Sequence, residues 1–449
     1  MYKVILAFRY LFKKRISYLA FTAVALSVFI VVVVMTVMRG LVTDFKQKNH
    51  NFSGDCVVAG DSLVGFAYYE DFVRTLQGED FVEGVSPVIN SFALISRQGS
   101  ARNIGVQIMG IDPVMHSRVT NFAETLHYNR HNVAGAFEPS RDPNHTGCIL
   151  GIGLVLEPDS NGVYDYYGAV LPAMALSVTS FPLTARGTLA KAGLGMVSSK
   201  TFYYSDVSHS GLARVDGAMV YLPFEQAQLL CMAGVEKRIS SIHIKFKHGV
   251  SLHSGLDKVS ALWKDFVKGK GSEKLAYLFE NVTVQSWKEH RREFIAAMEK
   301  EQTMLTVMFA LVGVTTVFIV FVVFYMIVSH KSKDIGILKS IGVSKTNVVG
   351  LYLSFAFLLG IFGSAGGLAG GWVFLLRINA IEHWLFKHFR FQLWDRTIYA
   401  IGDIPNKVDF GVLAIIVAAA LFACLLGAFI PSFKAARLKP VETLRVGQL

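Results

Sequence analysis

Four stretches of this chain run for about 20 residues or more without a charged side chain, and a helix of that length crosses ~30 Å of hydrocarbon. They cover residues 16–38, 304–328, 348–376 and 411–433. The run from Val28 to Val34 is apolar on every side of a helix, whereas a helix on a soluble core needs only one apolar face. The sequence therefore predicts four transmembrane helices. The first stretch exceeds the ~7–15-residue core of a signal peptide and lacks a small-residue cleavage site, so we expect it to remain as an anchor.

The basic residues lie at the ends of these apolar stretches. A formal net charge of +11 would suit a nucleic-acid partner, but this distribution orients a membrane protein instead, with lipid and not nucleic acid around it. By the positive-inside rule we expect both termini and the loop after the second stretch to be cytoplasmic, with residues 40–300 and 377–409 outside. The basic groups are Lys3, Arg9, Lys13, Lys14 and Arg15; Lys331, Lys333, Lys339 and Lys345; and Lys434, Arg437, Lys439 and Arg445.

The long segment between the first two apolar stretches is mostly strand-like in its periodicity, which predicts an α+β domain of two lobes. Strands are expected at residues 56–59, 106–109, 148–150, 218–221 and 241–245, and helices at 69–77 and 252–267. Residues 154–200 keep no period and predict a projecting hairpin or a flexible surface loop. Outside the membrane, Cys56, Cys148 and Cys231 are widely spaced, which allows one disulfide or none and argues against a metal site.

A helix start precedes the second apolar stretch. Ser286 and Glu289 have the spacing of a capping box, and the charged residues from there to Gln302 contain no glycine or proline. These residues predict a rod of ~25 Å that continues unbroken into the membrane. Residues 40–49 extend the first helix in the same way, so the two together would form a stalk. The alternative is an independent surface helix that ends at a bend.

The sequence contains no motif for catalysis on this chain. No phosphate-binding loop is present, because the nearest match, residues 342–346, lacks the glycine that precedes its lysine. There is also no Gly-x-Ser-x-Gly elbow and no His-Glu-x-x-His zinc pair. We therefore predict no catalytic residue, metal or cofactor here, and ATP, if it is used, must be hydrolysed by a partner.

The loop between the second and third apolar stretches predicts a short amphipathic helix. Ile337, Leu338 and Ile341 share one apolar face at 3.6 residues per turn, and Gly342 can end the helix. Lys333, Asp334 and Lys339 border that face. Such a helix can dock in a groove on another protein, or it can lie on anionic lipid headgroups.

Two motifs carry a resemblance to a known family. The loop at residues 329–345 resembles the basic-Glu-Ile-Gly-Ile-Leu-basic-x-hydrophobic-Gly-x-Ser signature of the MacB/FtsX superfamily of ABC permeases, and residues 431–445 resemble its terminal motif. Weaker matches at residues 53–58, 109–113 and 404–409 are similar to the lipoprotein-releasing (Lol-type) permeases. Asp334 replaces the usual Glu, and Ser432-Phe433 replaces a more basic pair. Residues 154–200 match poorly, where Lol-type permeases build the hairpin that captures a periplasmic carrier.

The resemblance implies a permease subunit in the bacterial inner membrane, paired with a second permease chain and an ABC-type ATPase dimer that binds the ATP and Mg. The ATP-driven step would extract lipoproteins toward a periplasmic carrier. Two alternatives stay open: a mechanotransmission permease that activates a cell-wall hydrolase or an efflux partner, and a membrane-anchored sensor. The residues implied to couple to the ATPase are Lys331, Lys333, Asp334, Ile335, Gly336, Ile337, Leu338, Lys339, Ile341 and Gly342.

The third apolar stretch is rich in glycines at small-x-x-x-small spacing, which lets helices approach closely where lipid provides no hydrophobic drive to associate. We predict a helix-packing seam; a flexible lipid-facing helix is the alternative. The seam residues are Gly363, Gly366, Gly367, Gly370 and Gly371, with Gly360 one turn earlier.

The predicted fold class is thus an α-helical membrane protein with four transmembrane helices and a large α+β extracytoplasmic domain inserted between helices 1 and 2. The expected segments are a cytoplasmic start (1–15), helix 1 (16–38), the periplasmic domain (39–285), the stalk with helix 2 (286–328), the coupling loop (329–345), helix 3 (346–376), a periplasmic loop (377–410), helix 4 (411–433) and a cytoplasmic tail (434–449).

Overall fold

The computed structural model describes residues 15–97, 103–139, 145–157, 164, 174–190, 197–233, 237–389 and 404–438. The chain divides into two compact units. One, here called the membrane unit, comprises Met1–Thr43, Ala297–Leu393 and Asp403–Leu449; the other, the inserted domain, is chiefly Asp44–Ala296. The basic residues predicted to flank the membrane before residue 15 and after residue 438 lie outside the described residues.

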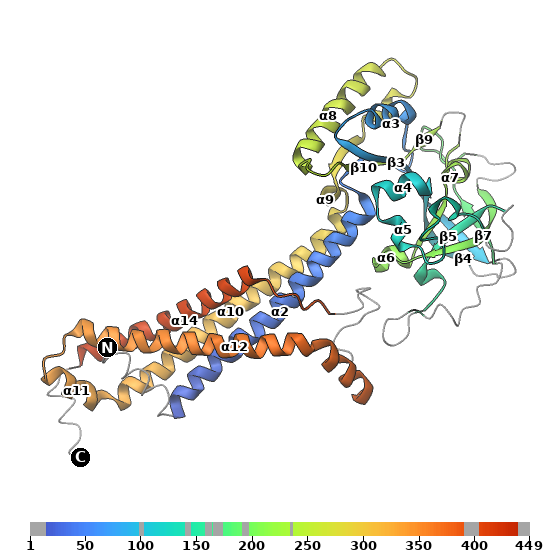
Figure 1. Cartoon of the computed structure of the whole chain (residues 1–449). Coiled ribbons are helices and arrows are strands. Elements are labelled where there is room, and N and C mark those ends of the chain that lie inside the picture. The colour runs from blue at the N-terminus through green and yellow to red at the C-terminus, as the bar shows by residue number, and fades with distance from the viewer. Residues whose placement is uncertain are drawn as a thin grey trace. The chain divides into compact units, whose positions relative to one another are not determined.

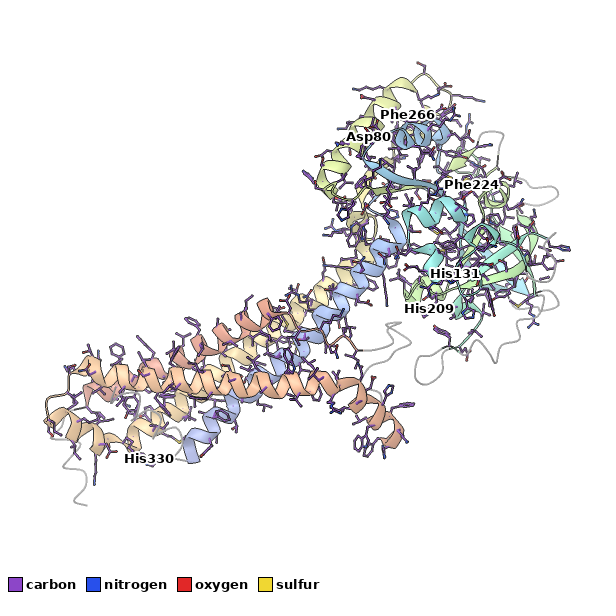
Figure 2. All side chains as sticks on the ribbon, in the orientation of Figure 1. Asp80, His131, His209, Phe224, Phe266 and His330 are labelled. Atoms are coloured by element: carbon purple, nitrogen blue, oxygen red, sulfur yellow. The ribbon has the colours of Figure 1, made fainter. Side chains whose placement is uncertain are left out.

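The membrane unit is built on the four predicted apolar stretches. Each belongs to a helix long and apolar enough to cross a membrane: α2 (Arg15–Ser53), α10 (Arg292–His330), α12 (Lys345–Phe389) and α14 (Phe410–Arg437). The short helix α11 (Ser332–Ser340) joins α10 to α12 at one end of the bundle, next to His330 (Figures 1 and 2). The prediction of four membrane helices with a large domain between the first and second is confirmed.

The inserted domain contains a nine-stranded sheet in the order β11-β1-β10-β3-β4-β8-β5-β7-β6. Its strands are β1 (Cys56–Gly60), β3 (Val82–Arg97), β4 (Asn103–Ile111), β5 (Gly147–Gly151), β6 (Ala175–Ser180), β7 (Ser198–Ser208), β8 (Met219–Pro223), β10 (Ser241–Phe246) and β11 (Val282–Ser286), and β2 (Phe66–Ala67) pairs separately with β9 (Arg238–Ile239). All five predicted strands are present, with ends that differ by at most three residues from the predicted ones.

Strand β3 joins the two halves of this sheet. Along one edge, β3 pairs with β10 from Val82 to Val88 and then with β6 from Ala93 to Arg97, while β4 occupies its other edge. Because β6 returns to β3, the strands β3-β4-β8-β5-β7-β6 close into a ring in that half of the sheet.

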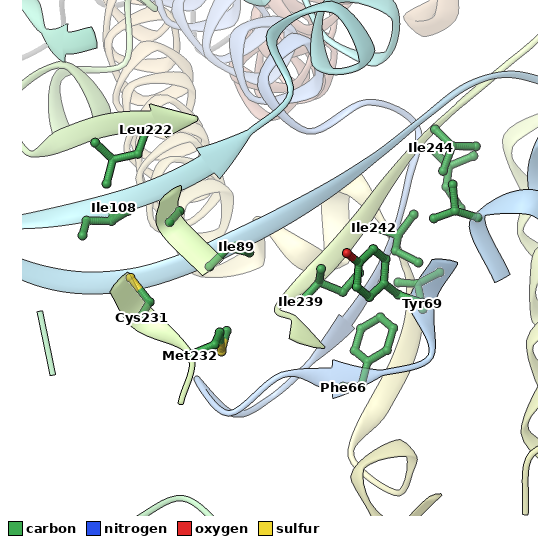
Figure 3. Packing of buried hydrophobic residues seen from close by; sticks show 14 of the residues in the cluster. Phe66, Tyr69, Ile89, Ile108, Leu222, Cys231, Met232, Ile239, Ile242 and Ile244 are labelled. Atoms are coloured by element: carbon green, nitrogen blue, oxygen red, sulfur yellow. The ribbon is translucent and has the colours of Figure 1, made fainter. Parts of the chain in front are cut away.

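The inserted domain also contains helices, two of which were predicted from the sequence. The helices are α3 (Tyr69–Gln77), α4 (Pro113–Val119), α5 (Phe122–Thr125), α6 (Ala213–Asp216), α7 (Phe224–Cys231), α8 (Leu252–Gly269) and α9 (Trp287–His290), with single 3-10 turns at Val133–Gly135, Ile152–Leu154 and Ala276–Phe279. The predicted helices at 69–77 and 252–267 are α3 and α8. Their apolar residues meet the strand residues in the main core, for instance Tyr69 near Ile242 (Figure 3).

A hairpin is present in the irregular region 154–200, since β6 and β7 pair antiparallel from Ala175–Tyr203 to Ser180–Ser198. The described first part of its connection lies against the domain. There the buried Arg238 guanidinium donates to the carbonyl oxygens of Leu183 at 2.6 Å and Thr184 at 3.3 Å. Most of residues 158–173 and 191–196, also within the predicted loop, lie outside the described residues. The four cysteines are free and buried.

The predicted stalk rod needs one correction. The capping box of Ser286 and Glu289 is present, but the helix that it starts, α9, ends after four residues. Arg291 leaves the helical conformation (φ −100°, ψ 17°), and α10 begins at Arg292. From there α10 is unbroken for 39 residues, and α2 likewise continues past residue 49 to Ser53. The continuous rod therefore starts at Arg292 and not at the capping box. The interruption lies at Arg291, whose side chain bonds to Asn49 of α2.

Candidate functional site

The short helix α11 has a well-defined start and end. At its start Lys331 pairs with Asp334, one turn along. At its end Gly342 takes a left-handed conformation (φ 97°), which a side chain would disfavour. The amide of Gly342 donates to the Lys339 carbonyl at 3.1 Å and that of Val343 donates to the Leu338 carbonyl at 3.2 Å. These two bonds form a Schellman motif, so glycine ends the helix as the sequence predicts.

The apolar residues of α11 divide between two directions. Ile335 is only 2% exposed and, with the buried Gly336, faces the other helices of the membrane unit. Ile337 and Ile341 are 49% and 76% exposed and lie four residues apart, on the same side of the helix. Leu338 is half-buried between the two groups. Two large aliphatic side chains are therefore left without cover at the end of the helix bundle.

Lys339 was predicted to border the docking face of α11, but its side chain bonds to the end of α14. Its ammonium donates to the carbonyl oxygens of Ala436 at 2.9 Å and Leu438 at 2.5 Å. These carbonyls end α14 and have no partner within their own helix, so a cation there satisfies them and favours the negative end of the helix dipole. Lys339 therefore fastens α11 to the end of α14. Its role could not be predicted because its partners lie 97 and 99 residues away along the chain.

The glycines of α12 lie in two rows. Gly363, Gly367 and Gly371 face α2: a Cβ at these positions would lie 2.8 Å from Val24 Cγ1, 2.5 Å from the Ala25 carbonyl oxygen and 3.2 Å from Val32 Cγ1. Gly366 and Gly370 lie at the margin, where a Cβ would first meet the rings of Phe21 at 3.2 Å and Phe29 at 3.5 Å. Gly360 faces Leu421 and Cys424 of α14 instead. The close approach of α12 to α2 thus depends on one row, at i, i+4 spacing.

Two further contacts between the membrane helices were missed by the sequence analysis. Gly427 of α14 lies where a Cβ would be 2.7 Å from the Val317 carbonyl oxygen of α10. The hydroxyls of Ser27 on α2 and Thr316 on α10 form a hydrogen bond of 2.8 Å. Small and hydroxyl residues inside apolar stretches are the signal that could have identified both.

Known proteins resemble this chain over most of its length. A family model described as the FtsX-like permease C-terminal domain matches residues 306–440, which include most of α10 and all of α11, α12 and α14. The lipoprotein-releasing system transmembrane protein LolC of Neisseria meningitidis is 23% identical over 444 residues, covering 96% of each chain. LolC of Xylella fastidiosa (strain Temecula1) is 24% identical over 450 residues, covering 98% of each chain, and LolE of Haemophilus influenzae is 20% identical over 384 residues, covering 84% of this chain and 80% of its own.

Among solved structures, the periplasmic region of MacB from Actinobacillus actinomycetemcomitans aligns with 55% of this chain and 95% of its own length, at 12% identity and a TM-score of 0.32. The extracellular domain of the transporter YknZ from Gram-positive bacteria aligns with 51% of this chain and 98% of its own length, at 10% identity and a TM-score of 0.31.

Proposed function

The chain is a permease of the MacB/FtsX superfamily, and on this premise we propose that it is the membrane subunit of an ABC transporter that releases lipoproteins from the inner membrane. ATP would be hydrolysed by a separate ATPase dimer, and a second permease chain, identical or homologous, would complete the membrane part. Both termini and α11 would be cytoplasmic, because the basic residues gather there, and the inserted domain would be periplasmic.

The observation that carries this proposal is the exposed pair of isoleucines on α11. Ile337 and Ile341 are large apolar side chains on a helix whose other contacts are already made, through Ile335 and Lys339. An apolar helix face of this size fits a groove on a partner protein. The cations that flank it, Lys333 and Lys345, would pair with acidic residues at the rim of that groove.

Movement of α11 would reach the rest of the permease through stiff elements. Lys339 joins α11 to α14, and Lys434 joins α14 to α10 by donating to the Tyr325 hydroxyl at 2.8 Å. Helix α10 is then continuous for 39 residues, about 58 Å at 1.5 Å per residue. A displacement imposed on α11 when the ATPase dimer closes would therefore move α10 and α14 together, as a rigid-body shift requires.

The energetics explain why a motor is needed for this substrate. Withdrawing a lipid anchor from the bilayer costs ~0.8 kcal/mol for each methylene that leaves it, so acyl chains of ordinary length do not dissociate unaided at useful rates. The released lipoprotein would pass to a periplasmic carrier, for which the β6–β7 hairpin is the proposed docking element.

The test substitutes the exposed isoleucines. Ile337→Asp and Ile341→Asp place a charge in the proposed apolar contact, and we expect both to abolish ATPase co-purification and ATP-dependent release of a lipoprotein from proteoliposomes. Neither side chain is buried in the chain itself, so expression and membrane insertion should be unchanged.

Thr346→Asp is the matched control. It adds the same charge to the same loop at an exposed position, at the start of α12, where a carboxylate is favourable. Normal ATPase binding by both isoleucine variants would refute the proposal. Equal loss in all three variants would show that negative charge, and not the loss of an apolar contact, is what matters.

A further inference from the structure

The inserted domain contains a cavity of about 240 Å³ that the proposed transport cycle does not use. It lies on the face of β3 and β4 that presents Asn90, Gln107 and Met109, beside the junction of α9 and α10. Phe52 at the end of α2, Met219 and Phe294 supply apolar walls. His243, His290 and Arg291 supply the polar side.

Arg291 is a half-buried cation with no counter-ion among the described residues. Its Nε donates to the amide oxygen of Asn49 at 2.9 Å, and its guanidinium lies 4.2 Å from the ring centre of Phe294 and 5.0 Å from that of Phe52. Burial lowers the pKa of Arg291 to about 10, so it is still charged at neutral pH. A neutral amide and two rings compensate a half-buried charge less well than an anion does.

His243 adds an unused acceptor. Burial lowers its pKa well below the ordinary value, as it lowers the pKa of His290 to about 4, so both rings are neutral at pH 7. The Nδ1 of His243 lies 3.0 Å from the Ser53 carbonyl oxygen and must donate to it. Its buried Nε2 therefore carries a lone pair, and it has no hydrogen-bond partner in the described part of the chain.

Arg291, His243 and the apolar walls together indicate which chemical groups a ligand of this cavity would carry. We propose that this cavity binds a small organic acid that carries a hydroxyl group: the carboxylate pairs with Arg291, the hydroxyl donates to His243 Nε2, and an aliphatic group packs between Phe52, Met109 and Phe294. Among the described residues that line the cavity, Arg291 alone is charged at neutral pH. A neutral hydroxyl donor therefore suits the site better than an ammonium group, which Arg291 would repel.

The site would influence the junction at which α2 and α10 meet the domain. Asn49 and Phe52 belong to α2, Phe294 lies in the first turn of α10, and Arg291 lies just before that turn. The Arg291 guanidinium contacts all three of the other residues. An anion bound to Arg291 stabilises the folded state, in which Arg291 contacts Asn49, Phe52 and Phe294. Binding should therefore raise the stability of the protein in proportion to ligand concentration.

The experiment titrates the full chain in detergent with 2-hydroxyisocaproate, using ligand-observed NMR and thermal melts. We expect saturable binding and a rise in melting temperature, about fivefold weaker binding of isocaproate, which lacks the hydroxyl, and at least tenfold weaker binding to Arg291→Met. Arg118→Met, at an exposed position outside the cavity, should bind normally. Absence of saturable binding to the unmodified protein, or unchanged binding to Arg291→Met, would overturn the proposal; equal affinity for the two acids would overturn the role given to His243.

A second variant guards against failure of Arg291→Met to fold. Gln107 is exposed at the rim of the cavity, so Gln107→Trp should be tolerated and should fill the space with its indole. Loss of 2-hydroxyisocaproate binding with normal folding supports the proposal, whereas retained binding places the ligand elsewhere and refutes it.

Discussion

Adding a single methyl group at Gly367 tests the packing of the membrane helices. A Cβ there would lie 2.5 Å from the Ala25 carbonyl oxygen and 2.8 Å from Val28 Cβ, so α12 and α2 must separate by roughly 1 Å to restore ordinary contact. The obstructing atom is backbone and cannot rotate away. Overpacking of this kind costs about 1–3 kcal/mol. At about 2–4 °C per kcal/mol for a body of this size, Gly367→Ala should lower the melting midpoint by about 2–12 °C.

Gly370→Ala is the matched control, since it adds the same methyl group one turn along the same helix. Its nearest neighbour would be Phe29 Cδ2 at 3.5 Å, an ordinary contact with a movable ring. Because alanine also favours helix over glycine by up to about 1 kcal/mol, this variant should melt at or slightly above the midpoint of the unmodified protein. Gly363→Ala, which meets a side-chain methyl of Val24 at 2.8 Å, should fall between the two.

The assay is tryptophan fluorescence of the purified full chain in detergent at a fixed heating rate, because membrane proteins often unfold irreversibly and their midpoints depend on that rate. Equal midpoints for Gly367→Ala and Gly370→Ala would refute the reasoning, since the two differ only in what the methyl group meets.

Two further predictions concern the inserted domain. Arg238→Gln removes a buried guanidinium that donates to four carbonyl oxygens. Each carbonyl left without a donor costs about 1–3 kcal/mol, so this variant should be destabilised by at least that amount and should be cleaved faster at residues 184–187. The exposed Arg74→Gln should show neither effect. Burial lowers the pKa of His116 to about 3 and that of His290 to about 4, so the folded state binds fewer protons than the unfolded state. Their stabilising contribution is therefore complete above pH 6.5 and is lost as the pH falls toward 4. Melts of the full chain should show this decline, and His116→Phe should reduce its slope; a parallel decline in the variant would contradict the assignment.

Much of the architecture could be predicted from local pattern. Apolar length identified the four membrane helices, and period identified α3, α8 and five strands of the sheet. These features depend on residues close together in sequence, so a window of about ten to twenty residues contains the information.

The rest depends on partners that are distant in sequence. The break before α10 arises because the Arg291 side chain binds Asn49, 242 residues earlier. The sequence around Lys339 is that of an ordinary solvated lysine, and only the fold shows that the end of α14 lies beside it. The same limit applies to the glycines of α12: spacing indicated all of them as seam residues, but only the position of α2 separates Gly367 from Gly370.

The attachment of Lys339 to the Ala436 and Leu438 carbonyls has a consequence for genetics. Truncations that remove the carboxyl terminus from Ala436 onward would release the lysine and loosen α11, although no residue of α11 has changed. Frameshifts near the end of the gene and missense changes in α11 should then give the same phenotype. A defect at the end of α14 could be compensated by a second change in α11, and a defect in α11 by a second change at the end of α14.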